Sequence, residues 1–112
     1  MDPKTLIRPW GKEFEYTLNT PSTVKILVVN PNEELSLQFH HKRSEFWRIL
    51  SGNPTIVIGD KTIESHPGDE FFIPAETLHR IKAVDHAEVL EISLGEFQES
   101  DIVRKEDKYG RS

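Results

Sequence analysis

Short hydrophobic runs recur along the chain, and several alternate with polar residues, as they do from Leu35 to His40. Because successive side chains of a strand point to opposite faces, this period indicates strands with one buried face. Strands are predicted at Glu13–Leu18, Val24–Val29, Glu34–His40, Phe46–Leu50, Thr55–Ile58, Lys61–Glu64, Glu70–Ile73, His79–Ala83 and Ala87–Leu94.

Turn-forming residues separate nearly all of these runs, and Gly59-Asp60 has the length of a two-residue hairpin turn. No interior segment keeps a helical period long enough to cover a sheet. The pattern predicts an all-β protein, either a closed barrel or a double-sheet jelly roll. The tail differs, because Ser100 is placed to cap a short helical turn with Asp101 near its positive end.

The composition narrows the class of protein further. A length of 112 residues predicts one domain over residues 1–112 with a single core. The 14 basic and 19 acidic residues, without a long basic run, argue against a nucleic-acid partner. The longest aliphatic run, Ile26–Val29, is too short for a membrane span, and the first residues do not form a signal peptide, so no membrane partner and a cytoplasmic location are expected.

Four residues near two turns carry a metal-binding pattern. Gln38 and His40 share the polar face of their strand, Glu45 follows after a short basic turn, and His79 comes just past a Pro-containing turn. The chain has no cysteine, so a metal must be held by histidine, carboxylate or amide. Two imidazoles with a carboxylate suit Zn²⁺ or a similar divalent ion. The alternative is that these are ordinary half-buried histidines beside a strand-surface amide.

Several segments together resemble one known family. They are Arg8–Gly11, Leu35–His41, Arg43–Trp47, Ile73-Pro74 with His79, Glu91 four residues before Gly95, and Asp101–Arg104 followed by Asp107–Arg111. In order and spacing they resemble the type II mannose-6-phosphate isomerase cupin. That domain commonly forms the C-terminal part of a bifunctional enzyme whose other half is mannose-1-phosphate guanylyltransferase. The chain departs from the usual pattern at Phe46 and Ser100 and resembles the isomerase half standing alone.

The resemblance implies a cupin-type jelly-roll barrel with a short C-terminal tail or helical turn. It also implies that Gln38, His40, Glu45 and His79 are the metal ligands, with Gln38 where most cupins have a histidine. A neutral amide oxygen makes a harder ligand shell than a third imidazole. Zn²⁺ acting as a Lewis acid is therefore expected rather than an oxygen-activating iron.

Three charged residues are candidates for catalysis. Arg43, near the barrel mouth, either binds phosphate or a sugar oxygen or forms a surface ion pair. The same choice applies to Arg104 and Arg111 in the tail, and for Arg104 the resemblance favours a tail that folds over the mouth. Glu91 shares a strand face with inward residues, so it is either an acid/base group or the partner of a buried arginine.

The resemblance predicts an aldose-ketose isomerase that interconverts mannose 6-phosphate and fructose 6-phosphate. Glu91 is then the candidate base, with metal-bound hydroxide as the alternative. The rivals are a non-catalytic sugar-binding or sensory cupin, to which Phe46 is the only pointer, a different isomerase or epimerase, and a dioxygenase, which Gln38 disfavours. Open strand edges further predict a homodimer.

Overall fold

The computed structural model describes residues 3–96 and 98–111 of the chain, which form strands and a single 3₁₀ turn. The elements are β1 (Lys4–Arg8), β2 (Gly11–Glu15), β3 (Ser22–Val29), β4 (Leu37–His40), β5 (Arg43–Ser51), β6 (Thr55–Ile58), β7 (Lys61–Glu64), β8 (Glu70–Ile73), β9 (His79–Lys82), β10 (Ala87–Gly95), the 3₁₀ turn η1 (Glu99–Asp101) and β11 (Ile102–Glu106). Among these residues no helix has the length and apolarity needed to cross a membrane.

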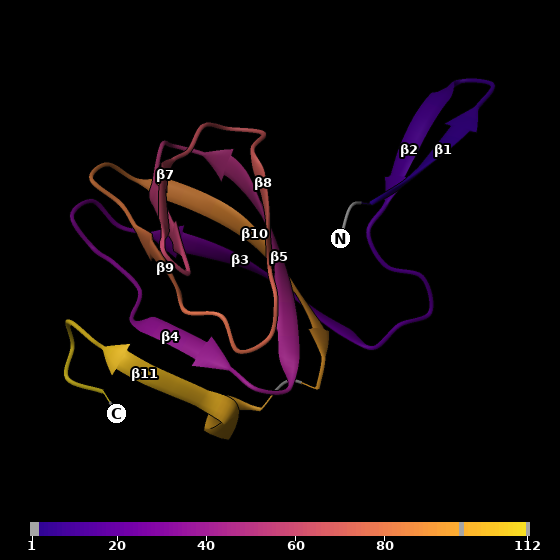
Figure 1. The fold of residues 1–112 in the computed structure, drawn as a ribbon. Coiled ribbons are helices and arrows are strands. Elements are labelled where there is room, and N and C mark those ends of the chain that lie inside the picture. The colour runs from indigo at the N-terminus through magenta and orange to yellow at the C-terminus, as the bar shows by residue number, and fades with distance from the viewer. Residues whose placement is uncertain (1–2, 97, 112) are drawn as a thin grey trace.

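Two antiparallel sheets make up the body of the molecule (Figure 1). One has the strand order β3-β10-β5-β8 and the other β11-β4-β9-β6-β7. Several neighbours are distant in sequence, such as β3 and β10, which pair from Val24 opposite Ile92 to Val29 opposite Ala87. The all-β, double-sheet architecture predicted from the sequence is confirmed.

The space between the sheets is apolar toward one end and polar toward the other. On β5 the inward side chains change from Ile49 and Trp47, both 1% exposed, to Glu45. On β10 they change from Val89 to Glu91, and Glu91 lies opposite both Trp47 on β5 and Lys25 on β3. The apolar end is the hydrophobic core, formed by Val29, Trp47, Ile49, Ile56, Ile73, Ile81, Ala83, Ala87 and Val89. The polar end holds the candidate site.

The N-terminal segment departs from the prediction. The expected strand Glu13–Leu18 ends at Glu15, and it pairs with β1, which the hydrophobic pattern did not reveal because Lys4–Arg8 is too short and mixed for a clear period. The β1–β2 hairpin, called here the arm, extends away from the two sheets (Figure 1).

The C-terminal segment also differs. Ser100 lies in the middle of η1 instead of capping a helix, and the chain then continues as β11 along the edge of β4. Asp101 accepts hydrogen bonds from the backbone N–H groups of His41 and Lys42 at 3.3 and 2.9 Å, so η1 is tied to the β4–β5 turn. The expected strand Glu34–His40 is shorter as well, because only Leu37–His40 is continuously paired.

Candidate functional site

Three of the predicted metal ligands come together between the sheets. His40 ends β4, His79 begins β9, and Glu45 lies near the start of β5 in the facing sheet. Their side chains are 2%, 2% and 1% exposed. One ligand atom from each can be chosen so that all three lie within 4.8 Å of one another. This is the clustering that a single bound cation requires.

The hydrogen bonding of this cluster favours a bound ion. Glu45 Oε1 and His79 Nε2 are 3.1 Å apart, but neither has a well-aligned hydrogen-bond partner within the described part of the chain. Buried polar atoms are nearly always satisfied, and an exception calls for an explanation such as an ion. Two imidazoles and a carboxylate match the donors of divalent metals such as zinc.

The surroundings of His40 and His79 suit both side chains to bind a metal ion. His79 Nδ1 is 2.8 Å from the carbonyl oxygen of Thr77, which orients the ring so that Nε2 faces Glu45. Burial lowers the pKa of His40 to about 4, against the opposing effect of the Glu45 carboxylate. His40 is therefore neutral near pH 7, as a metal ligand must be. Buried Trp47 packs against His79 in a T-shaped arrangement with ring centroids 5.5 Å apart.

Gln38 lies beside the cluster and directs its amide nitrogen, not its oxygen, toward His40. Its Nε2 is 3.5 Å from His40 Nε2, and its Oε1 accepts a hydrogen bond of 2.6 Å from Ser36 Oγ. Rotating the amide by half a turn exchanges its oxygen and nitrogen. The oxygen would then face His40, so the place of Gln38 as a fourth ligand stays a prediction.

Arg43 is buried, and the surface ion pair considered for it is wrong. Its side chain is 3% exposed, and its Nε lies 3.9 Å from Glu45 Oε2. Its Nη1 also reaches the backbone oxygen of Gln98 at 3.5 Å. An uncompensated buried charge is strongly unfavourable, and the two residues bring opposite charges together in this buried place.

Glu91 is the second buried carboxyl of the site. Burial, and next the charge of Glu45, raise the pKa of Glu91 to about 8. Burial alone would also raise the pKa of Glu45, but the imidazoles of His79 and His40 and the carboxyl of Glu91 more than offset this and lower it. The two neighbouring carboxyls thus differ in ionisation, with Glu45 charged and Glu91 protonated near pH 7.

A pocket of about 200 Å³ opens beside these groups. It is lined by Lys25, Leu27, Leu35, Ser36, Gln38, Arg43, Glu45, Glu91, Ile102, Arg104 and Arg111. Four of these side chains are cationic. The lining residues also include all three residues predicted to act in catalysis, which are Arg43, Arg104 and Glu91. Such a cationic wall favours an anionic ligand.

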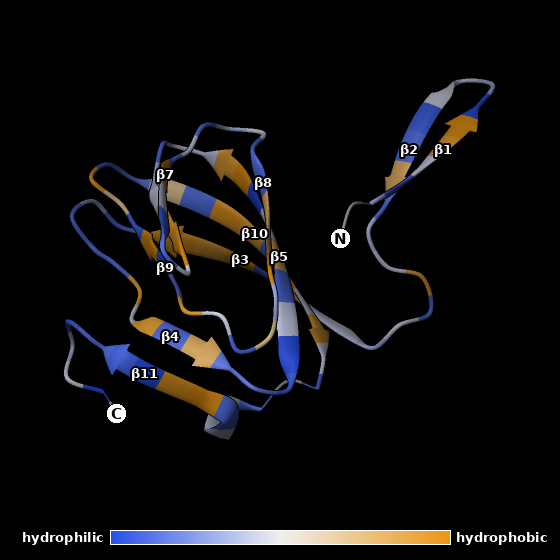
Figure 2. Ribbon diagram, in the orientation of Figure 1, coloured by the Kyte–Doolittle hydropathy of each residue, from blue (hydrophilic) through white to orange (hydrophobic). Residues whose placement is uncertain are grey.

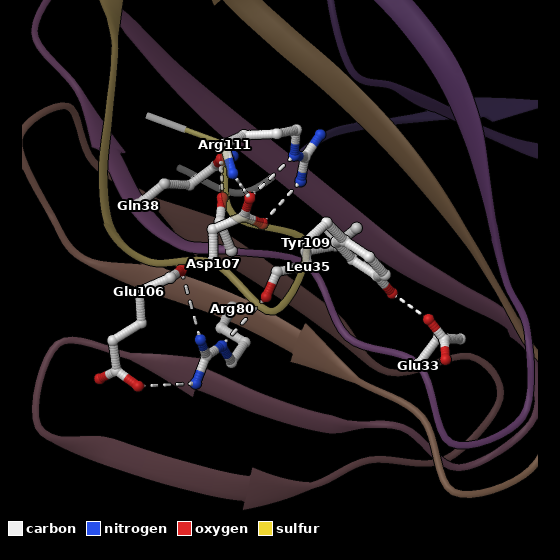
Figure 3. A network of polar contacts seen from close by, with 9 residues as sticks. Glu33, Leu35, Gln38, Arg80, Glu106, Asp107, Tyr109 and Arg111 are labelled. Atoms are coloured by element: carbon white, nitrogen blue, oxygen red, sulfur yellow. Dashed lines mark hydrogen bonds and ion pairs between the residues drawn. The ribbon is translucent and has the colours of Figure 1, made fainter.

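The C-terminal tail closes one side of this pocket, and Figure 3 shows the contacts of Tyr109 with Glu33 and of Arg111 with Asp107. The Tyr109 hydroxyl donates to Glu33, and Lys108 Nζ lies 2.9 Å from the same carboxylate. Arg111 forms two contacts of 3.0 and 3.1 Å with Asp107 across the turn. The segment 107–111, called here the latch, thereby places Arg111 at the pocket wall.

The comparison with protein families agrees with this arrangement. The family described as "Mannose-6-phosphate isomerase C-terminal" matches residues 2–107. The chain belongs to this family. The resemblance seen in its sequence segments is thus confirmed, and the match spans both sheets, the arm and β11.

Curated relatives carry the domain within longer proteins. Xanthan biosynthesis protein XanB of Xanthomonas campestris pv. campestris (strain B100) is 35% identical over 97% of this chain and 24% of its own length. Mannose-1-phosphate guanylyltransferase 2 of Escherichia coli O157:H7 is 33% identical over 95% of this chain and 23% of its own length. The chain thus spans about a quarter of the relatives it matches.

Solved structures confirm the fold. A cupin-2 domain from Rhodospirillum rubrum superposes with a TM-score of 0.63 at 20% identity, covering 71% of this chain and 59% of that one. At this identity the likeness shows the fold alone. The cupin fold implied by the sequence resemblance is therefore confirmed.

Sequence reasoning missed Lys25 and left Arg111 open. Lys25 shares the inward face of β3 with Leu27 and Val29, and a charge within that alternation is the signal that could have revealed it. Arg111 had no comparable signal, because its place depends on the latch. The remaining histidines, His41, His66 and His86, are 52%, 73% and 50% exposed and lie outside the site.

Proposed function

We propose that this domain is a metal-dependent aldose-ketose isomerase that interconverts mannose 6-phosphate and fructose 6-phosphate. The observation that carries the proposal is the cluster of His40, Glu45 and His79 beside a pocket with a cationic wall and a second buried carboxyl, Glu91. Membership of the isomerase family supports a sugar phosphate as the ligand.

His40, Glu45 and His79 would hold the metal, with Gln38 as the fourth donor. The isomerisation changes no overall oxidation state of the sugar, which favours a redox-inert ion such as zinc. When bound, such an ion supplies a Lewis acid that polarises the sugar oxygens at C1 and C2 and makes the adjacent C–H acidic. Arg43 supports this arrangement electrostatically, because its Nε lies 3.9 Å from the second carboxylate oxygen of Glu45.

Glu91 is placed to move the proton. It lines the same pocket as Glu45 and Arg43, so a sugar seated there would have its C1–C2 bond within reach of this carboxyl. In its ionised form Glu91 takes the proton from C2 of the aldose and returns it to C1 through an enediol. The hydroxyl proton passes from O2 to O1, so the atoms of the two sugars balance.

The cationic wall would take the phosphate and the developing oxyanion. Arg104 on β11, Lys25 on β3 and Arg111 on the latch line the pocket together with Arg43. A phosphate monoester carries a charge of about −1.5 to −2 near pH 7 and accepts several charge-assisted hydrogen bonds. Arg104 and Arg111 come from the tail, so binding of the phosphate depends on the tail's position.

A non-catalytic sugar-binding cupin remains the alternative from another functional class. Phe46, the residue that pointed to it, lies on the outer face of the four-stranded sheet and packs on Tyr16 with ring centroids 4.9 Å apart. This residue therefore does not shape the pocket, and no other residue of the site favours loss of catalysis.

A coupled assay on the metal-depleted and zinc-restored protein tests the proposal. Mannose 6-phosphate should turn over only after zinc is restored, while unphosphorylated mannose should react far more slowly because it does not engage the cationic wall. Tight binding of mannose 6-phosphate without turnover in the zinc-loaded protein would instead establish the sugar-binding alternative.

A further inference from the structure

Ser36 and Gln38 form a hydrogen-bonded pair beside the candidate metal site. Along β4 polar and apolar side chains alternate, which Figure 2 shows as hydrophilic and hydrophobic bands, and this places Gln38 on the same face as His40. Ser36, just before the strand, is 1% exposed, and both Ser36 and Gln38 line the pocket. The Ser36 hydroxyl donates a hydrogen bond of 2.6 Å to Oε1 of Gln38. The amide of Gln38 is therefore held on its oxygen side by a buried hydroxyl.

The nitrogen of the same amide contacts His40. Gln38 Nε2 is 3.5 Å from His40 Nε2, and because an amide nitrogen only donates, this contact uses the lone pair of the imidazole nitrogen. A metal ion binds histidine through the lone pair of a neutral ring nitrogen. The amide N–H and an ion on His40 Nε2 would therefore compete for one lone pair. This orientation of the amide is incompatible with a metal ion bound to that atom.

A half-turn of the Gln38 amide removes this competition. The oxygen then faces His40, where it can act as the fourth donor, and the NH₂ group faces Ser36. A buried N–H needs an acceptor, and a hydroxyl can accept as well as donate, so Ser36 can pair with the amide in either orientation. Arg104, the neighbour of Gln38 on β11, cannot take this part because a guanidinium only donates.

We propose that Ser36 is a positioning residue for the metal site, with a hydroxyl that accepts from the Gln38 NH₂ group while the amide oxygen is directed at the ion. This role rests on the metal site of the proposed function and acts on it through Gln38. As the amide turns, Ser36 changes from donor to acceptor, and the amide stays hydrogen bonded throughout. Removing an outer partner of a ligand typically weakens metal binding by about 10- to 100-fold.

Zinc affinity, measured by competition with a chromophoric chelator, is the first test. Ser36→Ala should bind zinc about 10- to 100-fold more weakly than the native chain. Ser65→Ala is the matched control, because Ser65 is also buried and donates to the carbonyl oxygen of Pro54 at 2.5 Å, outside the pocket lining. This control should keep the native affinity for zinc. Ser36→Thr retains a hydroxyl and should recover most of the affinity that Ser36→Ala loses, and circular dichroism checks that each variant folds.

A double-mutant cycle separates this role from a general effect on the fold. Gln38→Ala removes the amide on which Ser36 acts, so adding Ser36→Ala to that chain should change zinc affinity little further. An undiminished loss of affinity in the Gln38→Ala background would overturn the proposal. A Ser36→Ala chain that binds zinc as tightly as the native chain would overturn it too.

The native chain provides a direct view of the amide by NMR. The sequence has two glutamines, Gln38 and Gln98, and Gln38→Ala identifies the side-chain NH₂ signals of the first by their loss. These signals should shift when zinc is added, because the amide exchanges His40 for Ser36 as the partner of its nitrogen. Unchanged Gln38 signals at saturating zinc would contradict the turn of the amide.

The zinc affinity of the native chain distinguishes the two ways in which this role can fail. A native chain that binds no zinc would contradict the metal site of the proposed function and the role of Ser36 together. Tight zinc binding by the native chain, with the same affinity in Ser36→Ala, would overturn the role of Ser36 alone and leave the metal site in place.

Discussion

At the scale of single residues, the decisive groups are His40 and His79, because each places an imidazole nitrogen close to the carboxylate of Glu45. Replacing either by alanine removes one of the donors on which a tightly bound divalent ion depends. We expect His40→Ala and His79→Ala each to lower the zinc content of the purified protein severalfold or more by elemental analysis.

The adjacent His41 provides a matched control for this prediction. Its side chain is 52% exposed and lies 3.4 Å from Glu76, away from the cluster. His41→Ala should keep the zinc content of the native chain. Full zinc occupancy in both His40→Ala and His79→Ala would show that the cluster is not a metal site.

Glu91 can be tested through the fate of the transferred hydrogen. If the proton passes through an enediol and the base contacts solvent even briefly, mannose 6-phosphate turned over in D₂O should yield fructose 6-phosphate with deuterium at C1. Glu91→Gln keeps the size of the side chain but cannot accept the proton, so both turnover and deuterium incorporation should fall by about 10²-fold or more. Normal exchange in this variant, followed by NMR, would assign the base to another group.

The residue scale also shows what the sequence reveals about the site. Strand alternation and ligand chemistry were enough to select His40, Glu45 and His79, which the structure brings together. They were not enough to orient the amide of Gln38, because its contact with Ser36 depends on side-chain rotamers. The burial of Arg43 was also missed, because the strand was expected to begin at Phe46, whereas β5 begins at Arg43 and places this residue on the same inward face as Glu45.

At the scale of elements, Asp101 connects η1 to the β4–β5 turn. The backbone N–H of Lys42 and then that of His41 hold the pKa of Asp101 below its usual range. A carboxylate with a lowered folded-state pKa contributes stability above its unfolded pKa of about 3.9, and this contribution is lost as the pH falls through the folded-state pKa. Asp101→Asn should therefore lower the melting temperature between pH 5 and pH 8.

The loss of melting temperature in Asp101→Asn should become smaller at low pH. The difference between Asp101→Asn and the native chain should shrink only below about pH 4, where the unfolded aspartate becomes protonated. Asp60→Asn, in the β6–β7 turn, is the control and should change the melting temperature little at any pH. A constant difference down to pH 2 would show that the charge of Asp101 is not what holds the turn.

The latch is a second element whose role can be measured. Glu33→Gln weakens the contacts to Tyr109 and Lys108, so Arg111 should be held less firmly at the pocket. Exposed ion pairs are weak, so the rise in KM for mannose 6-phosphate should be modest, on the order of two- to fivefold, with kcat little changed. Glu64→Gln, which alters an exposed contact with Thr55, should leave both constants unchanged. A KM in Glu33→Gln equal to that of the native chain would contradict a role for the latch in binding.

The elements also show where prediction from the sequence fails. Strands of the body were found because their hydrophobic residues face a core, as in the 2-residue period of β3. The arm and β11 make little contact with that core, so their strands left a weak pattern. β11 instead forms by backbone pairing with β4, a contact between distant segments that periodicity does not report.

At the scale of the whole molecule, the candidate metal site joins the two sheets. Glu45 belongs to the four-stranded sheet, whereas His40 and His79 belong to the five-stranded sheet. An ion bound by all three would link the sheets at their polar end, where the hydrophobic core does not reach. The same ion would also satisfy Glu45 Oε1 and His79 Nε2, which lack aligned hydrogen bonds among the described residues.

Zinc should therefore stabilise the folded domain, because the ligand cluster is assembled only when the sheets are packed. At a free zinc concentration 100 times the dissociation constant, binding contributes about 2.7 kcal/mol, which raises the melting temperature of a domain of this size by roughly 10 °C. The comparison is between chelator-treated protein and the same sample with zinc restored, followed by calorimetry. In Glu45→Gln the shift should largely disappear, because the amide cannot replace the charged donor from the opposite sheet. An equal shift in Glu45→Gln and in the native chain would place the bound zinc elsewhere and remove the link between the sheets.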